Sequence, residues 1–185
     1  MICPIMETLL LKRYNSPLGA YTLASSQRGI VCISSEGETE AMIVKWERTG
    51  VLIHQGNGYN NVATDELDDY FKGKLRQFTV KLDLRGTSFQ CDVWQALCHI
   101  PYGETRSYQQ VALAVGRPIS ARPTGQAIGH NPIGIIIPCH RVIGSDGSLT
   151  GYGGGLDKKI ALLKLEGIRL QAHSIPSKIK VLPSL

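Results

Sequence analysis

The hydrophobic pattern of the chain changes at Arg85-Gly86, and this change is the strongest constraint on its fold. Before that point, apolar and polar residues alternate in short segments, which is typical of strands with one buried face. After it, apolar residues recur at helical spacing behind residues that can cap helices. We therefore expect an α/β protein with domains over residues 1–85 and 86–170 and a flexible tail over 171–185.

Strand signals fill the first domain. An alternating segment through Leu9, Leu11 and Arg13 ends at the turn Ser16-Pro17-Leu18-Gly19. Two more short strands are expected after it, so the start of the chain predicts a β-meander. The other signals predict strands over 21–24 and 30–33, helices over 41–47 and through Ala63, Leu67 and Tyr70, a loop over 51–61, and a strand or extended connector over 78–84.

Short helices dominate the second domain. Ser88 can cap a helix that buries Trp94 and Leu97, and Ser107 can cap a second helix. A third short helix is expected to end near Gly129. Three such helices, followed by a strand and a glycine-rich hairpin, are the outline of a winged helix-turn-helix. A last amphipathic helix is expected over 156–166.

Composition narrows the choice of partners and location. The net charge of +5 favours an anionic partner such as nucleic acid. The longest apolar run, Ile133 to Ile137, is too short to span a bilayer, and no signal peptide follows Met1, so we expect a cytoplasmic protein. Five cysteines without a CxxC pair do not resemble a disulfide framework or a zinc cluster. Four of them are expected to be small buried side chains.

Cys139 is the exception among the cysteines. It lies in Pro138-Cys139-His140-Arg141-Val142, after the apolar run over 133–137, which we expect to be a buried strand. A histidine can take a thiol proton directly or through water, and nearby positive charge favours the thiolate. Adjacent side chains of an extended chain point to opposite sides, so we expect His140 to reach Cys139 through water. By itself, the Cys-His pair leaves a structural and a nucleophilic cysteine about equally open.

The segment Pro138–Val142, with Asn131-Pro132 before it and Gly151-Tyr152 after it, resembles the active-site signature of the O6-alkylguanine-DNA alkyltransferases. The resemblance covers residues 86–170, whereas the first half matches loosely through the turn at 16–19. Further blocks resemble the family in the expected order: Gly86-Thr87-Ser88-Phe89-Gln90, Val93-Trp94, Ile100-Pro101-Tyr102-Gly103-Glu104-Thr105, Ser107-Tyr108, Lys159, Leu162-Leu163 and Glu166-Gly167.

The resemblance implies a ribonuclease H-like N-terminal domain and a winged helix-turn-helix C-terminal domain. It implies a monomer that binds double-stranded DNA, extrudes O6-alkylguanine, and moves the alkyl group irreversibly onto its own Cys139. O6-methylguanine would be the main substrate and O4-methylthymine a second one. No cofactor is implied. Zinc-binding members carry cysteine and histidine in the N-terminal domain, whereas this chain has Ser25-Ser26 and Ile30-Val31 there, so no metal is expected.

The resemblance also implies residue roles. Cys139 would be the nucleophile, His140 its base through a bound water, and Glu166 the residue that orients the histidine. Asn131 would order the turn that presents the thiol, and Tyr108 would donate a proton to the leaving guanine. Arg122 would fill the gap left by the extruded nucleotide. Further DNA contacts would come from Ser107, Thr124, Ala127 and Ile128, and the base pocket would be lined by Tyr152, Gly153, Ile137 and Pro138.

Two positions depart from the family pattern. Pro123-Thr124 replaces Ala-Val after Arg122, and Gly153 replaces a common serine, which removes one hydroxyl contact to the substrate. Proline is tolerable in the first turn of a helix, because the N–H groups there lack intrahelical partners. Its presence alters how this helix meets DNA.

Each assigned side chain has an ordinary structural explanation when taken singly, such as packing for Tyr108 or a lysine partner for Glu166. Their joint occurrence at the family's spacing favours the functional one. Other classes fit less well. An alkyltransferase-like lesion-binding protein would lack Cys139, a winged-helix regulator leaves the Cys-His pair unexplained, and a cysteine hydrolase would need an oxyanion site that the sequence does not indicate.

Overall fold

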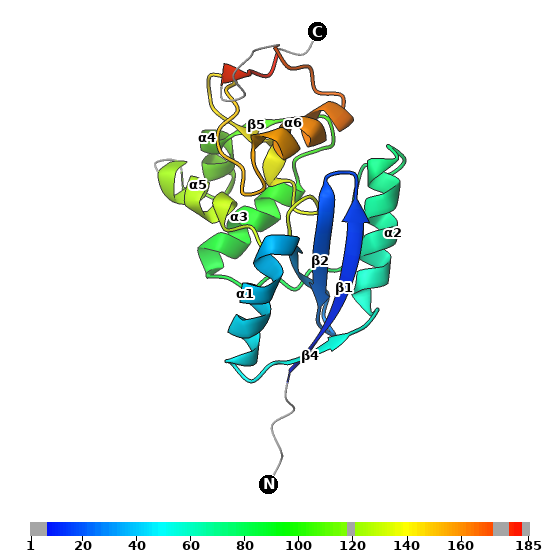
Figure 1. Ribbon diagram of the computed structural model, residues 1–185. Coiled ribbons are helices and arrows are strands. Elements are labelled where there is room, and N and C mark those ends of the chain that lie inside the picture. The colour runs from blue at the N-terminus through cyan, green and yellow to red at the C-terminus, as the bar shows by residue number, and fades with distance from the viewer. Residues whose placement is uncertain (1–6, 118–120, 172–177, 183–185) are drawn as a thin grey trace. The chain divides into compact units, whose positions relative to one another are not determined.

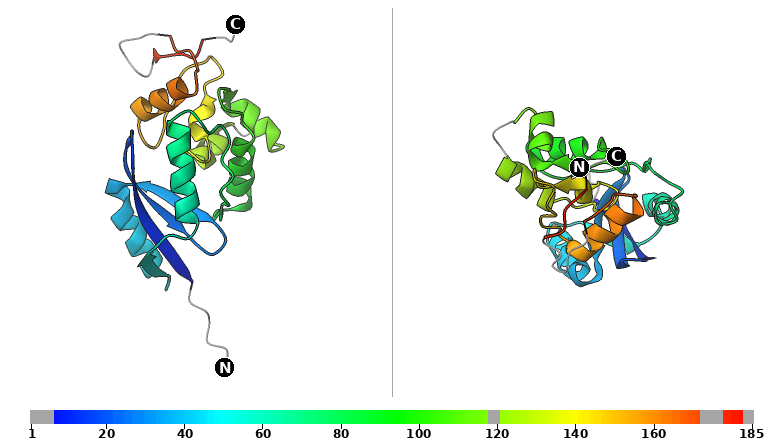
Figure 2. Two further views of the ribbon diagram at one scale, coloured as in Figure 1. Left: turned by 90° about the vertical axis from the view of Figure 1, so that its right-hand side faces the viewer. Right: turned by 90° about the horizontal axis from the view of Figure 1, so that it is seen from above.

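The computed structural model describes residues 7–117, 121–171 and 178–182. The chain divides into two compact units, Met1–Arg85 and Gly86–Leu185. Figures 1 and 2 draw the first unit in blue through teal and the second in green through red. Each unit has its own core and is described by itself.

A four-stranded sheet in the order β3-β2-β1-β4 forms the centre of the first unit. Strands β1 (Thr8–Ser16), β2 (Gly19–Ser25) and β3 (Ile30–Ser35) are antiparallel neighbours, which confirms the expected meander. At the first turn the Ser16 hydroxyl accepts a hydrogen bond from the Leu18 N–H (3.0 Å), and Gly19 has a positive φ of 114°. A residue with a side chain is disfavoured at such an angle, so glycine suits the turn.

Helices α1 (Glu36–Glu47) and α2 (Tyr59–Phe71) lie along opposite faces of this sheet (Figure 1). Neighbouring side chains of a strand point to opposite faces. In β1, Arg13 pairs with Glu36 of α1 at 2.6 Å, whereas the Tyr14 hydroxyl donates to Asp68 of α2 at 2.8 Å. The two helices therefore cover the two faces of β1.

The expected loop over 51–61 is wrong. Residues Leu52–Gln55 form β4, which pairs in parallel with β1, and α2 already begins at Tyr59. This strand is largely exposed, so it has no alternating pattern that the sequence could reveal. Its pairing with β1, about 44 positions earlier, includes a hydrogen bond from the Leu52 N–H to the Glu7 carbonyl (2.8 Å).

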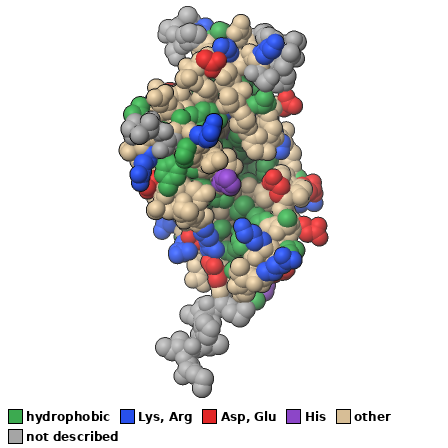
Figure 3. All heavy atoms as spheres, turned by 90° about the vertical axis from the view of Figure 1, so that its left-hand side faces the viewer, with side chains coloured by type: hydrophobic (Ala, Val, Ile, Leu, Met, Phe, Trp, Pro, Cys, Tyr) green, Lys and Arg blue, Asp and Glu red, His purple; other side chains and the backbone are tan. Residues whose placement is uncertain are grey.

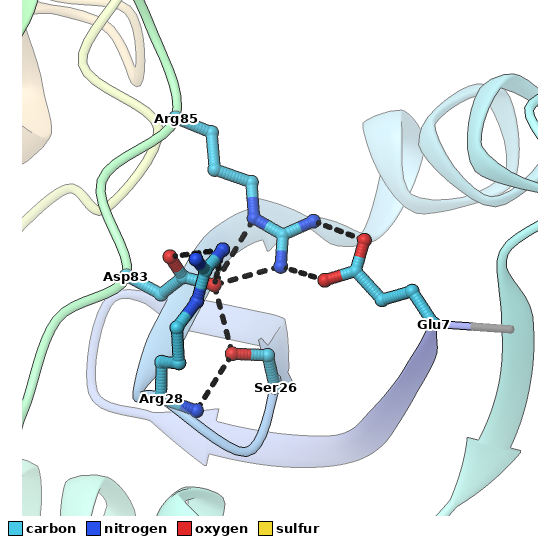
Figure 4. A network of polar contacts seen from close by, with 5 residues as sticks. All are labelled: Glu7, Ser26, Arg28, Asp83 and Arg85. Carbon is cyan, nitrogen blue, oxygen red and sulfur yellow. Dashed lines mark hydrogen bonds and ion pairs between the residues drawn. The ribbon is translucent and has the colours of Figure 1, made fainter. Parts of the chain in front are cut away.

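The segment over 78–84 is an extended connector with one bridge, from Leu82 to Ile30, rather than a strand of the sheet. A polar network holds its end (Figure 4). Buried Asp83 accepts hydrogen bonds from Arg85 Nη2 (2.7 Å) and from the Ser26 hydroxyl (2.8 Å), and it pairs with Arg28 (3.0 Å). Arg85 also binds the carboxylate of Glu7. The network fixes the last residues of the first unit to its sheet.

The second unit contains α3 (Ser88–Cys98), α4 (Tyr108–Ala114) and α5 (Ala121–Gly129) in close succession. Helix α4, a turn and α5 form the helix-turn-helix. Ser107 caps α4 as expected, whereas the N-cap of α3 is Thr87, one residue before the expected Ser88. Both caps are capping boxes, which satisfy two backbone donors at each helix start. The Trp94 indole donates to the Ala127 carbonyl (2.8 Å) and joins α3 to α5.

The expected strand over 133–137 is wrong as well. The run is buried, but it folds back on itself: the Ile137 N–H donates to the Ile133 carbonyl (2.9 Å), and Ile135 has a positive φ of 73°. Apolar composition predicts burial, and a short buried turn has the same composition as a short buried strand.

After this turn come β6 (Val142–Ile143), parallel to β5 (Arg106–Ser107), and helix α6 (Leu156–Leu165). Residues 178–182 are not the loose chain expected of the tail. The Val181 N–H donates to the Gly147 carbonyl (3.0 Å), and Ile179 and Val181 pack against an apolar cluster. The other parts of the expected tail beyond Gln171 lie outside the described residues. None of the described helices is both long and apolar enough to cross a membrane.

Candidate active site

Cys139 begins a short 3-10 helix, η1 (Cys139–Arg141), instead of ending a strand. Asn131 holds the turn before it at two points. Its side-chain Nδ2 donates to the Ile137 carbonyl (2.9 Å), and its Oδ1 accepts from the Ile133 N–H (3.0 Å). The same amide hydrogen-bonds the Cys139 thiol. The structure thus gives Asn131 the geometry of a residue that orders the turn.

Burial raises the pKa of the Cys139 thiol. The hydrogen bond from Asn131, the charge of Lys159 and the backbone N–H groups of η1 act in the opposite direction but do not outweigh burial. The thiol is consequently protonated at neutral pH in the absence of DNA. A nucleophilic role for it requires a base that removes this proton.

His140 and Glu166 form a buried pair next to this thiol. His140 Nε2 lies 2.8 Å from Glu166 Oε1, and both side chains are inaccessible to solvent. A carboxylate accepts hydrogen bonds, so Nε2 carries the proton and Nδ1 carries the lone pair of a neutral ring. Within the described part of the chain, His140 Nδ1 is buried and has no hydrogen-bond partner. The lone pair of His140 is therefore available to a proton.

The groups around His140 and Glu166 keep the imidazole neutral and the carboxylate ionised. Burial lowers the pKa of His140, and the positive charges of Arg141 and Lys159 act in the same direction. Hydrogen bonds from His140 and Arg141 lower the pKa of Glu166 to about 2 although burial opposes them. At neutral pH the pair is a neutral imidazole and an ionised carboxylate.

Arg141 and Gly103 fix the carboxylate of Glu166. Arg141 donates from Nη2 (2.8 Å) and Nε (2.9 Å), and the Gly103 N–H donates to Oε2 (3.2 Å). The remaining Nη1 of Arg141 donates to the Ile100 carbonyl (2.6 Å). Glu166 thus balances a buried arginine and orients His140 at the same time, whereas the sequence suggested lysines as its structural partners.

Lys159 matched the family pattern in the sequence, but no role in the site was predicted for it. Its side chain is buried (1% exposed), and Nζ donates to the carbonyls of Val142 (2.6 Å) and Thr150 (3.0 Å). Burial lowers the pKa of Lys159 to about 8, although a thiolate at Cys139 would raise it. The available signal was its place on the apolar face of α6, three and four positions before Leu162 and Leu163.

Tyr108 is the first residue of α4, and its hydroxyl accepts a hydrogen bond from the Thr150 hydroxyl (3.0 Å). Its ring lies beside α5, because a Cβ at Gly125 would be 3.5 Å from it. The phenol is half-buried and is held from both sides. Thr150 was not among the residues that the sequence indicated.

The residues expected to contact DNA differ in their exposure. Arg122 is exposed in the first turn of α5, where Pro123 is accommodated, and Ser107 is half-buried and uses its hydroxyl to cap α4. Three residues have side chains buried in the core, so any contact with DNA would come from their backbone, and that contact stays a prediction: Thr124, Ala127 and Ile128.

The residues expected to line the base pocket also differ in their exposure. Tyr152 is half-buried, with its hydroxyl 3.9 Å from the position of a Cβ at Gly134, and Gly153 is exposed. Ile137 and Pro138 are buried beside Cys139, and their role in lining the base pocket stays a prediction. Their contribution is to the backbone of the turn: the Cys139 N–H donates to the Ile137 carbonyl (2.8 Å).

The other described cysteines, Cys32, Cys91 and Cys98, are free thiols, and Cys3 lies outside the described residues. Burial raises the pKa of Cys32 to about 12, and burial also raises that of Cys98. His99 follows Cys98, but its Nδ1 lies 2.8 Å from the Gln95 carbonyl. On the face drawn in Figure 3, lysine and arginine are spread among other side chains rather than forming a single patch.

Comparisons with known proteins identify the family of the chain. Residues 88–168 match the family model of the 6-O-methylguanine DNA methyltransferase DNA binding domain, and residues 9–84 match that of its ribonuclease-like domain. A methylated-DNA–protein-cysteine methyltransferase of Mycobacterium leprae is 58% identical over 152 residues, which cover 82% of this chain and 88% of that protein. One of Mycobacterium tuberculosis is 61% identical over 110 residues, or 60% and 67% of the two chains.

The fold agrees as well. The crystal structure of Mycobacterium tuberculosis OGT in complex with DNA superimposes with a TM-score of 0.73 at 47% identity, covering 86% of this chain and 92% of that chain. Both units and their order along the chain are thus shared with the family. The chain belongs to the methylated-DNA–protein-cysteine methyltransferase family.

Proposed function

We propose that this protein repairs alkylated DNA by moving the alkyl group from O6 of guanine to Sγ of Cys139. The observation that carries the proposal is the buried His140–Glu166 pair. It leaves His140 Nδ1 without a hydrogen-bond partner among the described residues, in the residue that follows Cys139 in η1. The family supports DNA repair by alkyl transfer as the activity.

The reaction is a displacement at the alkyl carbon. As the bond from carbon to Sγ of Cys139 forms, the bond from carbon to guanine O6 breaks. The thiol proton passes through a water to Nδ1 of His140, whose imidazolium Glu166 stabilises. Tyr108 donates its phenolic proton to the leaving guanine and regains one from solvent. A thioether does not hydrolyse at neutral pH, so each molecule reacts once.

The helix-turn-helix would bring DNA to the thiol. A base inside a duplex is out of reach of Cys139, so the damaged nucleotide must leave the stack at a cost of a few kcal/mol. Arg122, exposed at the start of α5, has the position and length to enter the gap.

We propose O6-methylguanine as the main substrate and O4-methylthymine as a second one. We also propose that the protein acts in the cytoplasm as a monomer. The described thiols are free, and a reaction that consumes a thiol suits a reducing compartment. Gly153 offers no hydroxyl to the substrate oxygen, so binding of the flipped base falls more heavily on Tyr152 and Tyr108.

Intact-protein mass spectrometry after mixing with a duplex that carries O6-methylguanine tests this proposal. One added methyl, mapped to Cys139 and limited to one per molecule, is the expected result. Cys139→Ser should abolish the mass change and keep DNA binding, and Cys98→Ser, which alters the exposed thiol, should transfer as the natural protein does. Tight binding without any methyl transfer would instead indicate a lesion-binding protein and would overturn the proposal.

A further inference from the structure

Thr150 connects two parts of the site through two different groups. Its hydroxyl donates a hydrogen bond to the Tyr108 hydroxyl (3.0 Å), and its backbone carbonyl accepts one from Lys159 Nζ (3.0 Å). Thr150 is exposed and belongs to the loop between β6 and α6. An exposed threonine in a loop has no packing reason to be held at both ends.

Lys159 ties this loop to the turn of the nucleophile. The same ammonium group donates to the Val142 carbonyl (2.6 Å), three residues after Cys139. Because the lysine is buried, a loss of either bond would leave its charge with one partner fewer in an apolar setting. The position of Thr150 is therefore fixed relative to the backbone that carries the thiol.

The Tyr108 ring is held independently by its helices. Ser107 caps the helix that Tyr108 begins, and the ring lies beside Gly125 of α5. These contacts place the phenolic oxygen but leave its hydrogen free to rotate about the C–O bond. The hydrogen bond from Thr150 removes that freedom in part, because one lone pair of the phenolic oxygen is occupied and the phenolic hydrogen must point elsewhere.

We propose that Thr150 is a positioning residue that keeps the phenolic proton of Tyr108 directed away from the loop and available to the leaving base. The inference rests on the proposed function and deepens it, since it concerns proton delivery rather than binding. The hydrogen bonds of Thr150 are to Tyr108 and Lys159, and the role proposed for it is exerted through the Tyr108 phenol. Its effect should therefore appear only in reactions that need a proton on the leaving group.

Thr150→Val replaces the hydroxyl by a methyl group of similar size and keeps the backbone carbonyl for Lys159. We expect the single-turnover rate on saturating O6-methylguanine duplex to fall about three- to tenfold, which corresponds to the loss of one hydrogen bond in the transition state. Alkylation of Cys139 by iodoacetamide, whose iodide leaves without a proton, should proceed as in the natural protein. Thr150→Ser, which retains the hydroxyl, should restore the rate on DNA.

A double-mutant cycle with Tyr108→Phe separates positioning from loop structure. If Thr150 acts through the phenol, Thr150→Val adds no further loss to Tyr108→Phe. If the rate losses of the two single variants multiply in the double variant, or if Thr150→Val slows the reaction with iodoacetamide equally, the inference is overturned. Either result would indicate that the threonine supports the structure of the loop. A Thr150→Val protein as fast as the natural one would overturn it too. Failure of the natural protein itself to take up a methyl group would instead contradict the proposed function.

Discussion

His140 Nε2 lies 2.8 Å from Oε1 of Glu166, a residue 26 positions later in the chain, and both side chains are inaccessible to solvent. This contact determines which nitrogen of His140 is a base. Because Nε2 donates to the carboxylate, only Nδ1 can accept a proton from the thiol or a bridging water.

Glu166→Gln should slow methyl transfer to DNA by about a hundredfold or more, because a neutral amide neither fixes the tautomer of His140 nor stabilises its imidazolium. The single-turnover rate on O6-methylguanine duplex is the measurement. It should be made well below the melting temperature, since the substitution also removes the charge partner of buried Arg141. Glu104→Gln, which alters an exposed ion pair with Arg106, is the matched control. A rate equal to that of the control would remove Glu166 from the relay.

The protein should lose stability in acid in two steps. The folded pKa of His140 is below its unfolded value of 6.5, so only the unfolded chain gains that proton, and stability falls as the pH drops below 6.5. The folded pKa of Glu166 is about 2 against 4.5. Its contribution is complete above 4.5 and is lost as the pH falls towards 2, on the order of 3 kcal/mol.

Urea unfolding as a function of pH measures both steps. In His140→Gln the loss below pH 6.5 should largely vanish, while the steeper loss below pH 4.5 remains. Identical curves for the natural protein and this variant would show that His140 is protonated in the folded state as readily as in the unfolded chain.

Arg122→Ala should slow repair in duplex DNA much more than reaction with free O6-benzylguanine, because only the duplex requires a side chain in the gap. The ratio of the two rates is the measurement. Arg48→Ala removes one exposed positive charge from the first unit and is the control for net charge. Equal slowing of both reactions by Arg122→Ala would contradict a role in base extrusion.

Asp83→Ala should destabilise the first unit by about 1–3 kcal/mol, because the side chains of Ser26 and Arg28 lose their shared acceptor and Arg85 keeps only Glu7. The free energy of unfolding in urea is the measurement. Asp65→Ala, on the exposed side of α2, should change stability by less than about 0.5 kcal/mol. A similar effect of both substitutions would mean that the network in Figure 4 contributes little.

Features that depend on neighbouring residues could be predicted from the sequence. The meander, the turn at Ser16–Gly19, the capped start of α4 and the order of the helices follow from alternation, glycine and capping residues within a few positions. The family, and Cys139, His140 and Glu166 as a candidate set, came from the resemblance of short sequence motifs to those of a known family.

Contacts between distant segments, in contrast, could not be predicted from the sequence and depend on the folded arrangement. The pairing of β4 with β1, the fold-back of residues 133–137 and the burial of Thr124 in the core depend on what packs against them. The bonds from Lys159 to Val142 and Thr150 are of the same kind. A lysine on an apolar helix face and an exposed threonine carry no local sign of a shared partner, since hydrogen bonding across a fold depends on positions in space rather than on spacing along the chain.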